Sequence, residues 1–274
     1  MSQPNKPKGK LSARSLIIIG VIVLIIAAAV AEAADNGVLG KIISKNQIVV
    51  AMEGTWMPWT YHDQETGALT GFDFEVANAI ASRLGVKAKF EECPWDSIFA
   101  GIGNRYDICV NGVDWTQERA ESFTLSIPYV YNYPVLIVRE DSAIASFDDL
   151  KGKKTANTAS STYAALAESY GATNTPVDDL NQTLQLLIDK RIDATINSAD
   201  TFNEYKANNP DAPLKIAARA ESANSVVIVM PGKNAEALAE AINRAIDELK
   251  QDGTLTALSI KYFGTDMTVP PTNE

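Results

Sequence analysis

The sequence predicts an α/β protein made of two lobes with a cleft between them. The composition is globular, because 46% of the 274 residues are hydrophobic and 21% are charged. This excludes a disordered chain, a collagen-like repeat and a multi-span membrane protein. From residue 46 onward, apolar strands alternate with amphipathic helices, and a second run of the same alternation begins near Tyr133. Such alternation implies parallel strands with right-handed crossovers, so we expect two doubly wound mixed sheets.

The first α/β unit is predicted from its apolar runs and from the stripe of its first helix. The run QIVVAM is almost continuously apolar, which is typical of a strand covered on both faces. In the helix that follows, Phe72, Val76, Ile80 and Leu84 share one face, and Gly85 ends it. The predicted elements are strand 47–52, helix 71–84, strand 87–92, helix 96–103 and strand 107–112.

The second unit repeats this pattern. One of its helices points Leu180, Leu184 and Leu187 inward and has Asp178 or Asp179 as its N-cap. The predicted elements are strands 134–139 and 154–157, a helix from 161, helix 178–189, strand 192–196, helix 200–207, strands 214–218 and 225–230, helix 234–251 and a short helix ending near 263–264.

The chain is expected to cross between the lobes twice, at a hinge of two segments near Val130–Asn132 and Ala223–Val226. The first lobe is predicted to comprise residues 34–130 and 224–274, and the second lobe residues 131–223.

The N-terminal 33 residues are predicted to be an export signal. Four basic residues between positions 6 and 14 precede an apolar run over 16–30, and Ala31-Glu32-Ala33 supplies the small-x-small pattern that a signal peptidase needs. The apolar stretch extends to Ala34, so an uncleaved anchor over 16–34 stays open. We expect the protein in the periplasm or another extracytoplasmic space.

Several classes of function are disfavoured by the residue inventory. The net charge is -10, whereas a nucleic-acid binder is usually basic on one face. His62 is the only histidine and lies in a polar stretch, so a catalytic Ser-His-Asp or Cys-His group and a metal site are not expected. The segment Gly101-Ile102-Gly103 lacks the third glycine of a dinucleotide fingerprint, and no cofactor is expected. Cys93 and Cys109 belong to strands with another strand between them, which predicts two buried free thiols.

Aromatic and charged residues follow three strands of the first unit and indicate a binding site. The segments are EGTWMPW after the first strand, CPW after the second and GVDWTQER after the third. Ligands in open α/β sheets bind beyond the carboxyl ends of the strands, so the three loops should meet at one edge. In the second unit, Ala159-Ser160-Ser161-Thr162 precedes a helix, whose free N–H groups form an anion site.

The motifs resemble a known family when they are taken in order. GTWMPW, TGFDFEVANAIASRLGV, NGVDWTQERAESFTLSIPY, SFDDLKGKKTANTASST and KQDGTLTALSIKYFG are similar to segments of the family 3 type solute-binding proteins of ABC transporters for polar amino acids, nearest to the cystine-binding branch. The resemblance covers about residues 36–266. It implies the two-lobed type II periplasmic-binding-protein fold and a monomer that delivers a small L-amino acid to an ABC permease.

The resemblance also assigns roles to individual residues. It implies that Arg119 binds the ligand α-carboxylate, that Trp56 stacks on the ligand side chain and that Trp95 forms a second wall. Glu53 would meet a distal polar or cationic group, and Gly112 would offer its carbonyl to the ammonium. Ser161 and Thr162 would close over the carboxylate from the second lobe.

The sequence departs from the family at the ammonium site. Ser198 stands where the family usually has Asp, with Asp200 two residues later, and Asp114 stands where the family usually has Ser or Thr. A buried ammonium needs a carboxylate, since an unpaired buried charge costs several kcal/mol. We therefore expect Asp114 to pair with the ammonium and Ser198 to be a neutral partner, with Asp200 as the alternative.

The expected function is binding without catalysis, of a polar amino acid, a cationic amino acid or cystine. Two alternatives stay open: a ligand-sensing ectodomain tethered by the N-terminal segment, and a lyase similar to cyclohexadienyl dehydratases, in which Glu53 or Asp114 acts as a general acid.

Overall fold

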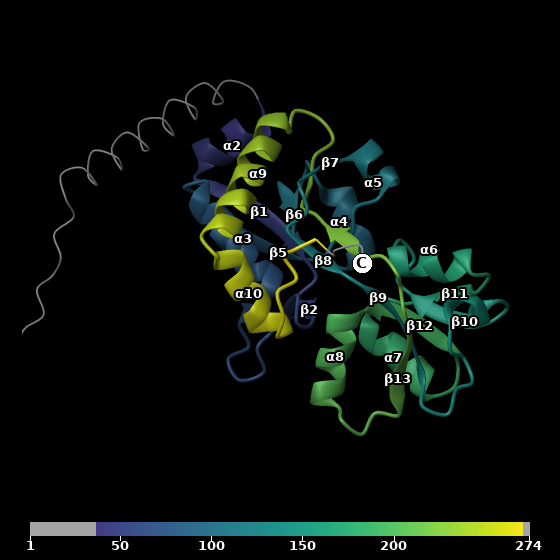
Figure 1. Ribbon diagram of the computed structural model, residues 1–274. Helices are drawn as coiled ribbons and strands as arrows, with labels where there is room; N and C mark the ends of the chain where they lie inside the picture. Colours follow the sequence, from purple (N-terminus) through teal and green to yellow (C-terminus); the bar gives the residue numbers. More distant parts are fainter. Residues whose placement is uncertain (1–36, 271–274) are drawn as a thin grey trace, which may run out of the picture.

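The computed structural model describes residues 37–270, which form two lobes joined by a narrow waist (Figure 1). The first lobe holds helices α2 (Val38–Lys45), α3 (Phe72–Arg83), α4 (Trp95–Gly101), α5 (Gln117–Ser122), α9 (Glu236–Gln251) and α10 (Thr254–Phe263). Its strands are β1 (Gln47–Met52), β2 (Thr55–Trp56), β3 (Thr60–His62), β4 (Leu69–Thr70), β5 (Lys87–Glu92), β6 (Ile108–Cys109), β7 (Thr124–Leu125) and β15 (Val229–Met230).

The central sheet of the first lobe has the strand order β5-β1-β6-β15-β7. The strands β5 and β6 both pair with β1 in parallel, as the sequence predicts, whereas β15 is antiparallel to β6 and β7. The three parallel strands place their carboxyl ends, and the loops that follow them, at one edge of the sheet.

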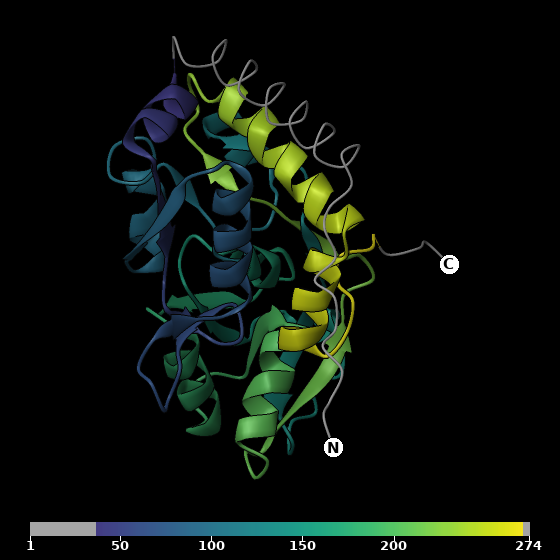
Figure 2. The same cartoon turned by 90° about the vertical axis from the view of Figure 1, so that its left-hand side faces the viewer.

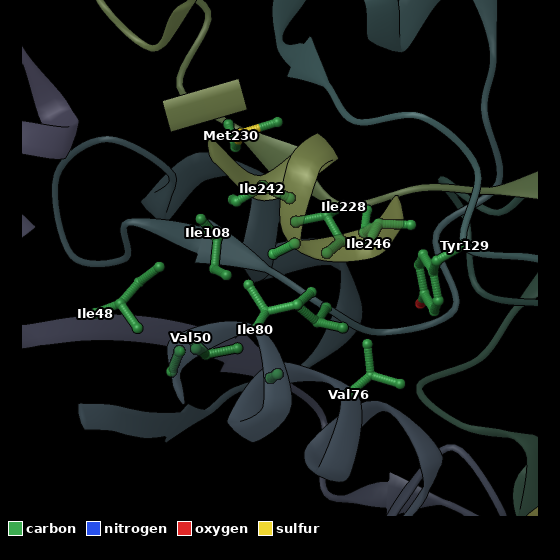
Figure 3. Close-up of a cluster of buried hydrophobic side chains, with 14 of the residues drawn as sticks. Ile48, Val50, Val76, Ile80, Ile108, Tyr129, Ile228, Met230, Ile242 and Ile246 are labelled. Atoms are coloured by element: carbon green, nitrogen blue, oxygen red, sulfur yellow. The ribbon is translucent and has the colours of Figure 1, made fainter. Parts of the chain in front are cut away.

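The main hydrophobic core lies between this sheet and the helices α3 and α9 (Figure 3). Ile48 and Val50 of β1 and Ile80 of α3 are fully buried there, together with Ile242 and Ile246 of α9. The apolar stripe of α9 is the physical reason for this packing, because an amphipathic helix buries one face against a sheet. Helices α9 and α10 follow each other and cover one side of the lobe (Figure 2). The rigid core therefore fixes the strand ends that carry the site loops.

The second lobe contains two small sheets and three helices. In one sheet, β9 (Pro134–Arg139) lies between β12 (Ala194–Ser198) and β13 (Leu214–Arg219), and both neighbours are antiparallel to it. In the other sheet, β10 (Lys154–Asn157) and β11 (Thr173–Pro176) are parallel. The remaining elements are the 3-10 turn η1 (Phe147–Leu150) and helices α6 (Thr162–Ser169), α7 (Leu180–Ile188) and α8 (Ala199–Asn208).

The two crossing segments between the lobes form a ribbon of two antiparallel strands, β8 (Val130–Asn132) and β14 (Asn224–Val226). They occupy the positions expected for the hinge. Asp114 bridges to Val226 at the edge of this ribbon, so the third site loop of the first lobe touches the crossing chain. The lobe boundaries at residues 130 and 224 stay a prediction.

Several local expectations differ from the structure. The strand expected over 107–112 ends at Cys109, because Asn111 and Gly112 turn their polar groups into side-chain hydrogen bonds. The strand expected over 225–230 is split into β14 and β15, which belong to different sheets. The hairpin β2–β3–β4 and helix α5 were not expected as regular elements.

Both cysteines are free. Cys109 lies in β6 and Cys93 directly follows β5, and these two strands flank β1. Cys109 is buried, but Cys93 is only half-buried, so the expectation of two buried thiols is wrong for Cys93. Between residues 37 and 270 no helix combines the length and the apolar character needed to cross a bilayer. The predicted export signal lies outside the described residues.

Candidate functional site

A cleft between the lobes receives the three strand-end loops of the first lobe and two helix N-termini of the second. The space between its walls is about 630 Å³ when the part open to solvent is included, and its interior cavity is about 70 Å³. The lining residues are Glu53, Thr55, Trp56, Trp95, Gly112, Asp114, Arg119, Asn157, Thr158, Ser161, Thr162, Tyr163, Asp179, Leu180, Thr183 and Asn197.

Arg119 lies on α5, the helix that comes after strand β6 in the chain. The Thr116 hydroxyl caps this helix by accepting a hydrogen bond from the Arg119 backbone N–H at 3.1 Å. The guanidinium donates to the carbonyl of Asp114 at 2.7 Å and to the carbonyl of Ser160 at 3.2 Å, and its carbon lies 5.5 Å from the centre of the Trp95 ring. Burial lowers the pKa of Arg119. A guanidinium has five N–H donors, so a carboxylate can bind beside these two carbonyls.

Asp114 is the buried carboxylate of the cleft, with 4% of its surface exposed. Its Oδ2 accepts hydrogen bonds from the Thr162 hydroxyl and, at 2.8 Å, from the Asn224 amide of the hinge. Its Oδ1 is buried and has no hydrogen-bond partner. Burial raises the pKa of Asp114 to about 6, although the Thr162 hydrogen bond and the charge of Arg119 act in the opposite direction. A free buried carboxylate oxygen is a site for a cationic or N–H group.

Two more buried polar atoms of the cleft lack partners. The indole Nε1 of Trp95 and the hydroxyl of Tyr163 make no hydrogen bond, and both side chains are more than nine-tenths buried. Buried polar groups are almost always satisfied in folded proteins. The orphan atoms of Trp95, Asp114 and Tyr163 leave hydrogen-bonding capacity unused in the cleft, where Asn132 lies beside Asp114 and Ser198 beside Tyr163.

Trp56 forms the aromatic wall of the cleft and is held from behind. Its ring stacks on the fully buried Trp59 with ring centres 5.4 Å apart. Gly112 has a φ of +56°, and a Cβ at this position would lie 2.5 Å from the Trp56 ring. The Gly112 N–H donates to the buried Asp73 at 2.6 Å. Only glycine fits between the ring and the backbone here.

Glu53 directly follows β1 and lines the cleft. It is held by Asn111, which accepts from the Glu53 backbone N–H at 2.8 Å and donates from its amide to the Glu53 carboxylate at 2.7 Å. Burial raises the pKa of Glu53 to about 7, and the nearby carboxylates Asp179 and Asp96 add to this rise. The buried carboxylate would regain its charge beside a cationic group.

The second lobe contributes the N-terminus of α6. Ser161 is its N-cap, and its hydroxyl accepts from the Ala164 N–H at 3.1 Å. Thr162 directs its hydroxyl to Asp114 across the cleft. Ser161 therefore has the capping role that the sequence suggests, while Thr162 joins the two lobes.

Ser198 and Asp200 lie outside the residues that line the cleft. Asp200 accepts from the Trp59 indole N–H at 2.9 Å and from the Ser198 hydroxyl at 3.2 Å, and Ser198 also donates to Thr201 at 2.7 Å. Burial raises the pKa of Asp200 to about 6. At the start of α8, Asp200 thus accepts from Trp59 and Ser198 bonds within the same turn, and a ligand contact for either remains a prediction.

The family follows from comparison with known proteins. Residues 48–265 match the model of the bacterial extracellular solute-binding proteins, family 3. The chain belongs to this family. It is 38% identical over 224 residues to a probable amino-acid ABC transporter-binding protein of Haemophilus influenzae, covering 81% of this chain and 86% of that protein.

Two solved structures of the family differ in how well they superpose. The L-cystine solute receptor of Neisseria gonorrhoeae, in its unliganded open conformation, is 41% identical and has a TM-score of 0.58, covering 84% of this chain and 99% of that one. The amino acid ABC transporter substrate-binding protein AbpA of Streptococcus pneumoniae, bound to L-arginine, is 27% identical and has a TM-score of 0.76, covering 83% and 99%. The less identical, liganded protein is the better match, as expected if the two lobes of this solute-binding protein are closed.

Contacts across the cleft agree with a closed arrangement. The Ser160 hydroxyl donates to Asp96, the Trp59 indole donates to Asp200, and Arg119 reaches the Ser160 carbonyl. Each of these bonds joins a residue of the first lobe to one of the second, and each would break if the lobes moved apart.

Some cleft residues of this solute-binding protein were missed in the sequence. Asn157 and Asn197 lie at the C-terminal ends of strands β10 and β12, and Thr158 follows β10, so the rule that ligands bind at strand ends could have found them. Tyr163 carries no local signal of this kind. Asp179 was noticed only as a helix cap, which the structure confirms, and it also faces the cleft.

Proposed function

We propose that the protein binds an L-amino acid in the cleft and delivers it to an ABC permease. The ligand class is a polar or cationic amino acid or L-cystine. The observation that carries the proposal is the pair formed by Arg119 and Asp114. They place a guanidinium and an unpartnered carboxylate oxygen in one cleft, which is the charge pattern that complements an α-carboxylate and an α-ammonium.

The order of the binding steps follows from how the site residues are divided between the two lobes. The first lobe holds Arg119, Asp114 and Trp56, so the ligand binds it first. The second lobe then closes and covers the ligand with Thr162 and the N-terminus of α6. Exclusion of water strengthens both ion pairs. The permease recognises the closed form, and no bond is made or broken.

The proposed preference for a polar or cationic ligand side chain is supported by Trp56 and Glu53 and by the named relatives. The Trp56 ring offers a stacking surface, and a cationic group over such a ring gains about 0.5–2 kcal/mol. Glu53 would remain unpaired with a small aliphatic side chain, which disfavours that class. One relative is named for L-cystine, and another was solved with L-arginine.

A thermal-shift screen against the common L-amino acids, ornithine and cystine tests this function, with calorimetry on the hits. A ligand that binds only the folded state raises the melting temperature. Arg119→Lys keeps the charge but loses bidentate geometry, and should weaken binding at least tenfold, whereas Arg105→Lys at an exposed position should not. No shift with any amino acid would refute the proposal.

The same protein should show no turnover of prephenate or arogenate. Glu53 has a pKa of about 7, suitable for a general acid. We propose instead that this carboxylate awaits a cationic group, and measurable dehydration of either compound would contradict this.

We also propose that the protein is extracytoplasmic and monomeric, since one chain supplies both halves of the cleft. N-terminal sequencing of the exported protein would show cleavage after Ala33 if the signal is removed. Sedimentation would give the oligomeric state.

A further inference from the structure

We propose that Asp179 of the second lobe and Glu53 of the first lobe form a two-sided clamp for a cationic group at the distal end of the ligand. This inference rests on the amino-acid binding proposed above. It adds a recognition residue from the second lobe and narrows the ligand to molecules with a distal ammonium or guanidinium.

The position of Asp179 is fixed by the helix that it caps. Its Oδ1 accepts a hydrogen bond from the Gln182 N–H at 2.9 Å, which holds the carboxyl group at the first turn of α7. The next residue, Leu180, and Thr183 one turn later line the cleft with it. Glu53 lines the same cleft from the opposite lobe, held by Asn111. A group between these two carboxylates therefore touches both lobes.

No cation of the protein neutralises this pair. Among the cleft-lining residues of the described chain, Arg119 is the only Lys, Arg or His, and its guanidinium bonds to the carbonyls of Asp114 and Ser160. Asp96 is the third carboxylate near Glu53, and it accepts a hydrogen bond from the hydroxyl of Ser160. The negative charge of Glu53 and Asp179 is thus left for a ligand to balance.

Unpartnered polar atoms also line the same cleft. The orphan atoms of Trp95, Asp114 and Tyr163 belong to side chains more than nine-tenths buried in this cleft. We assign them to the α-amino-acid end of a ligand, because Trp95 lies against Arg119 and because the unpartnered oxygen of Asp114 can accept from an ammonium. Glu53 and Asp179 remain for the other end.

The clamp makes closure depend on the charge of the ligand side chain. Without a cation, two carboxylates brought together by closure repel each other. A distal cation turns this repulsion into attraction on both sides. A neutral side chain of the same shape leaves the repulsion in place, so it should bind the first lobe with little closure.

The test compares Asp179→Asn with Asp178→Asn in the full chain, purified in mild detergent. Asparagine is as good an N-cap as aspartate, so the α7 cap is kept. Asp178 is the matched control, because it is exposed and does not line the cleft. Calorimetry measures three ligand pairs that differ in distal charge: L-arginine and L-citrulline, L-lysine and L-norleucine, and L-cystine and S-ethylthio-L-cysteine.

We expect Asp179→Asn to weaken the charged member of the preferred pair at least tenfold and to leave its neutral partner as tightly or more tightly bound, because the repulsion is relieved, with Asp178→Asn unchanged. Glu53→Gln should behave like Asp179→Asn. Equal weakening of both members, or no effect of Asp179→Asn, overturns the clamp while amino-acid binding stands. Wild-type preference for the neutral members also overturns it. Failure of the wild type to bind any α-amino acid overturns the function proposed above.

Discussion

Replacement of Asp114 by asparagine separates the charge of the ammonium site from its shape. The Oδ2 atom of Asp114 accepts two hydrogen bonds, from Thr162 and Asn224, and an asparagine oxygen can accept the same two. The NH₂ group then takes the place of the unpartnered Oδ1 and points a donor at the ligand ammonium. The fold is kept, and the site changes from attractive to repulsive.

The expected loss follows from this geometry. Truncating one partner of a buried, hydrogen-bonded charge pair costs about 2–5 kcal/mol. This corresponds to a Kd about 30-fold to several thousand-fold weaker. The ligand-free variant should unfold at the same or a higher temperature, because it no longer buries an ionisable carboxyl whose pKa is raised to about 6.

The assay is calorimetry at pH 7.5, where the Asp114 carboxylate is charged, with Asp200→Asn as the matched control. Asp200 is also a carboxylate with a pKa raised to about 6, but it faces Trp59 and does not line the cleft. Its replacement should change Kd less than threefold. If Asp114→Asn binds like the wild type and Asp200→Asn loses 30-fold or more, the assignment of the ammonium site is refuted.

Three further changes have expected outcomes. Because burial raises the folded-state pKa of Glu53 from 4.5 to about 7, the folded chain holds more protons than the unfolded chain in that window, so ligand-free stability should fall as pH rises from 4.5 to 7, by at most about 3 kcal/mol from this group. Melting curves of the wild type and Glu53→Gln check this, and equal slopes would contradict it. Thr162→Val removes a hydrogen bond to Asp114 and should weaken ligand binding about tenfold, as calorimetry would show. Gly112→Ala places a Cβ 2.5 Å from the Trp56 ring at a φ of +56°. It should abolish tight binding and lower the melting temperature, and normal affinity would show that the ring can move.

The elements with strong periodicity could be predicted from the sequence. The stripes of α3 and α9 and the apolar run of β1 are set by burial, so their pattern survives in the structure. The two-residue strands β2, β4 and β7 were not predicted, because they are defined by their pairing with other segments. Their residues alone carry no period.

The part of the candidate site that follows from the strand-end rule could be predicted from the sequence. Glu53, Trp95 and Arg119 follow consecutive strands of one parallel sheet, so the topology brings them together. Tyr163 and Asp179 come from the other lobe, and their place in the cleft depends on how the lobes close. Asp200 shows the reverse case. Its carboxyl is near the expected position in sequence, but the first turn of α8 directs it to Trp59.

The charges of the cleft and the contacts between the lobes act in opposite directions on closure. Hydrogen bonds from Trp59 to Asp200 and from Ser160 to Asp96 favour the closed form without any ligand. Inside the cleft, burial raises the pKa of Glu53 and of Asp114, although the charge of Arg119 partly offsets the rise at Asp114. Closure of the empty protein therefore costs either proton uptake or charge burial. A ligand that supplies cations at both ends removes this cost, so the same carboxylates that select the ligand also make closure depend on it.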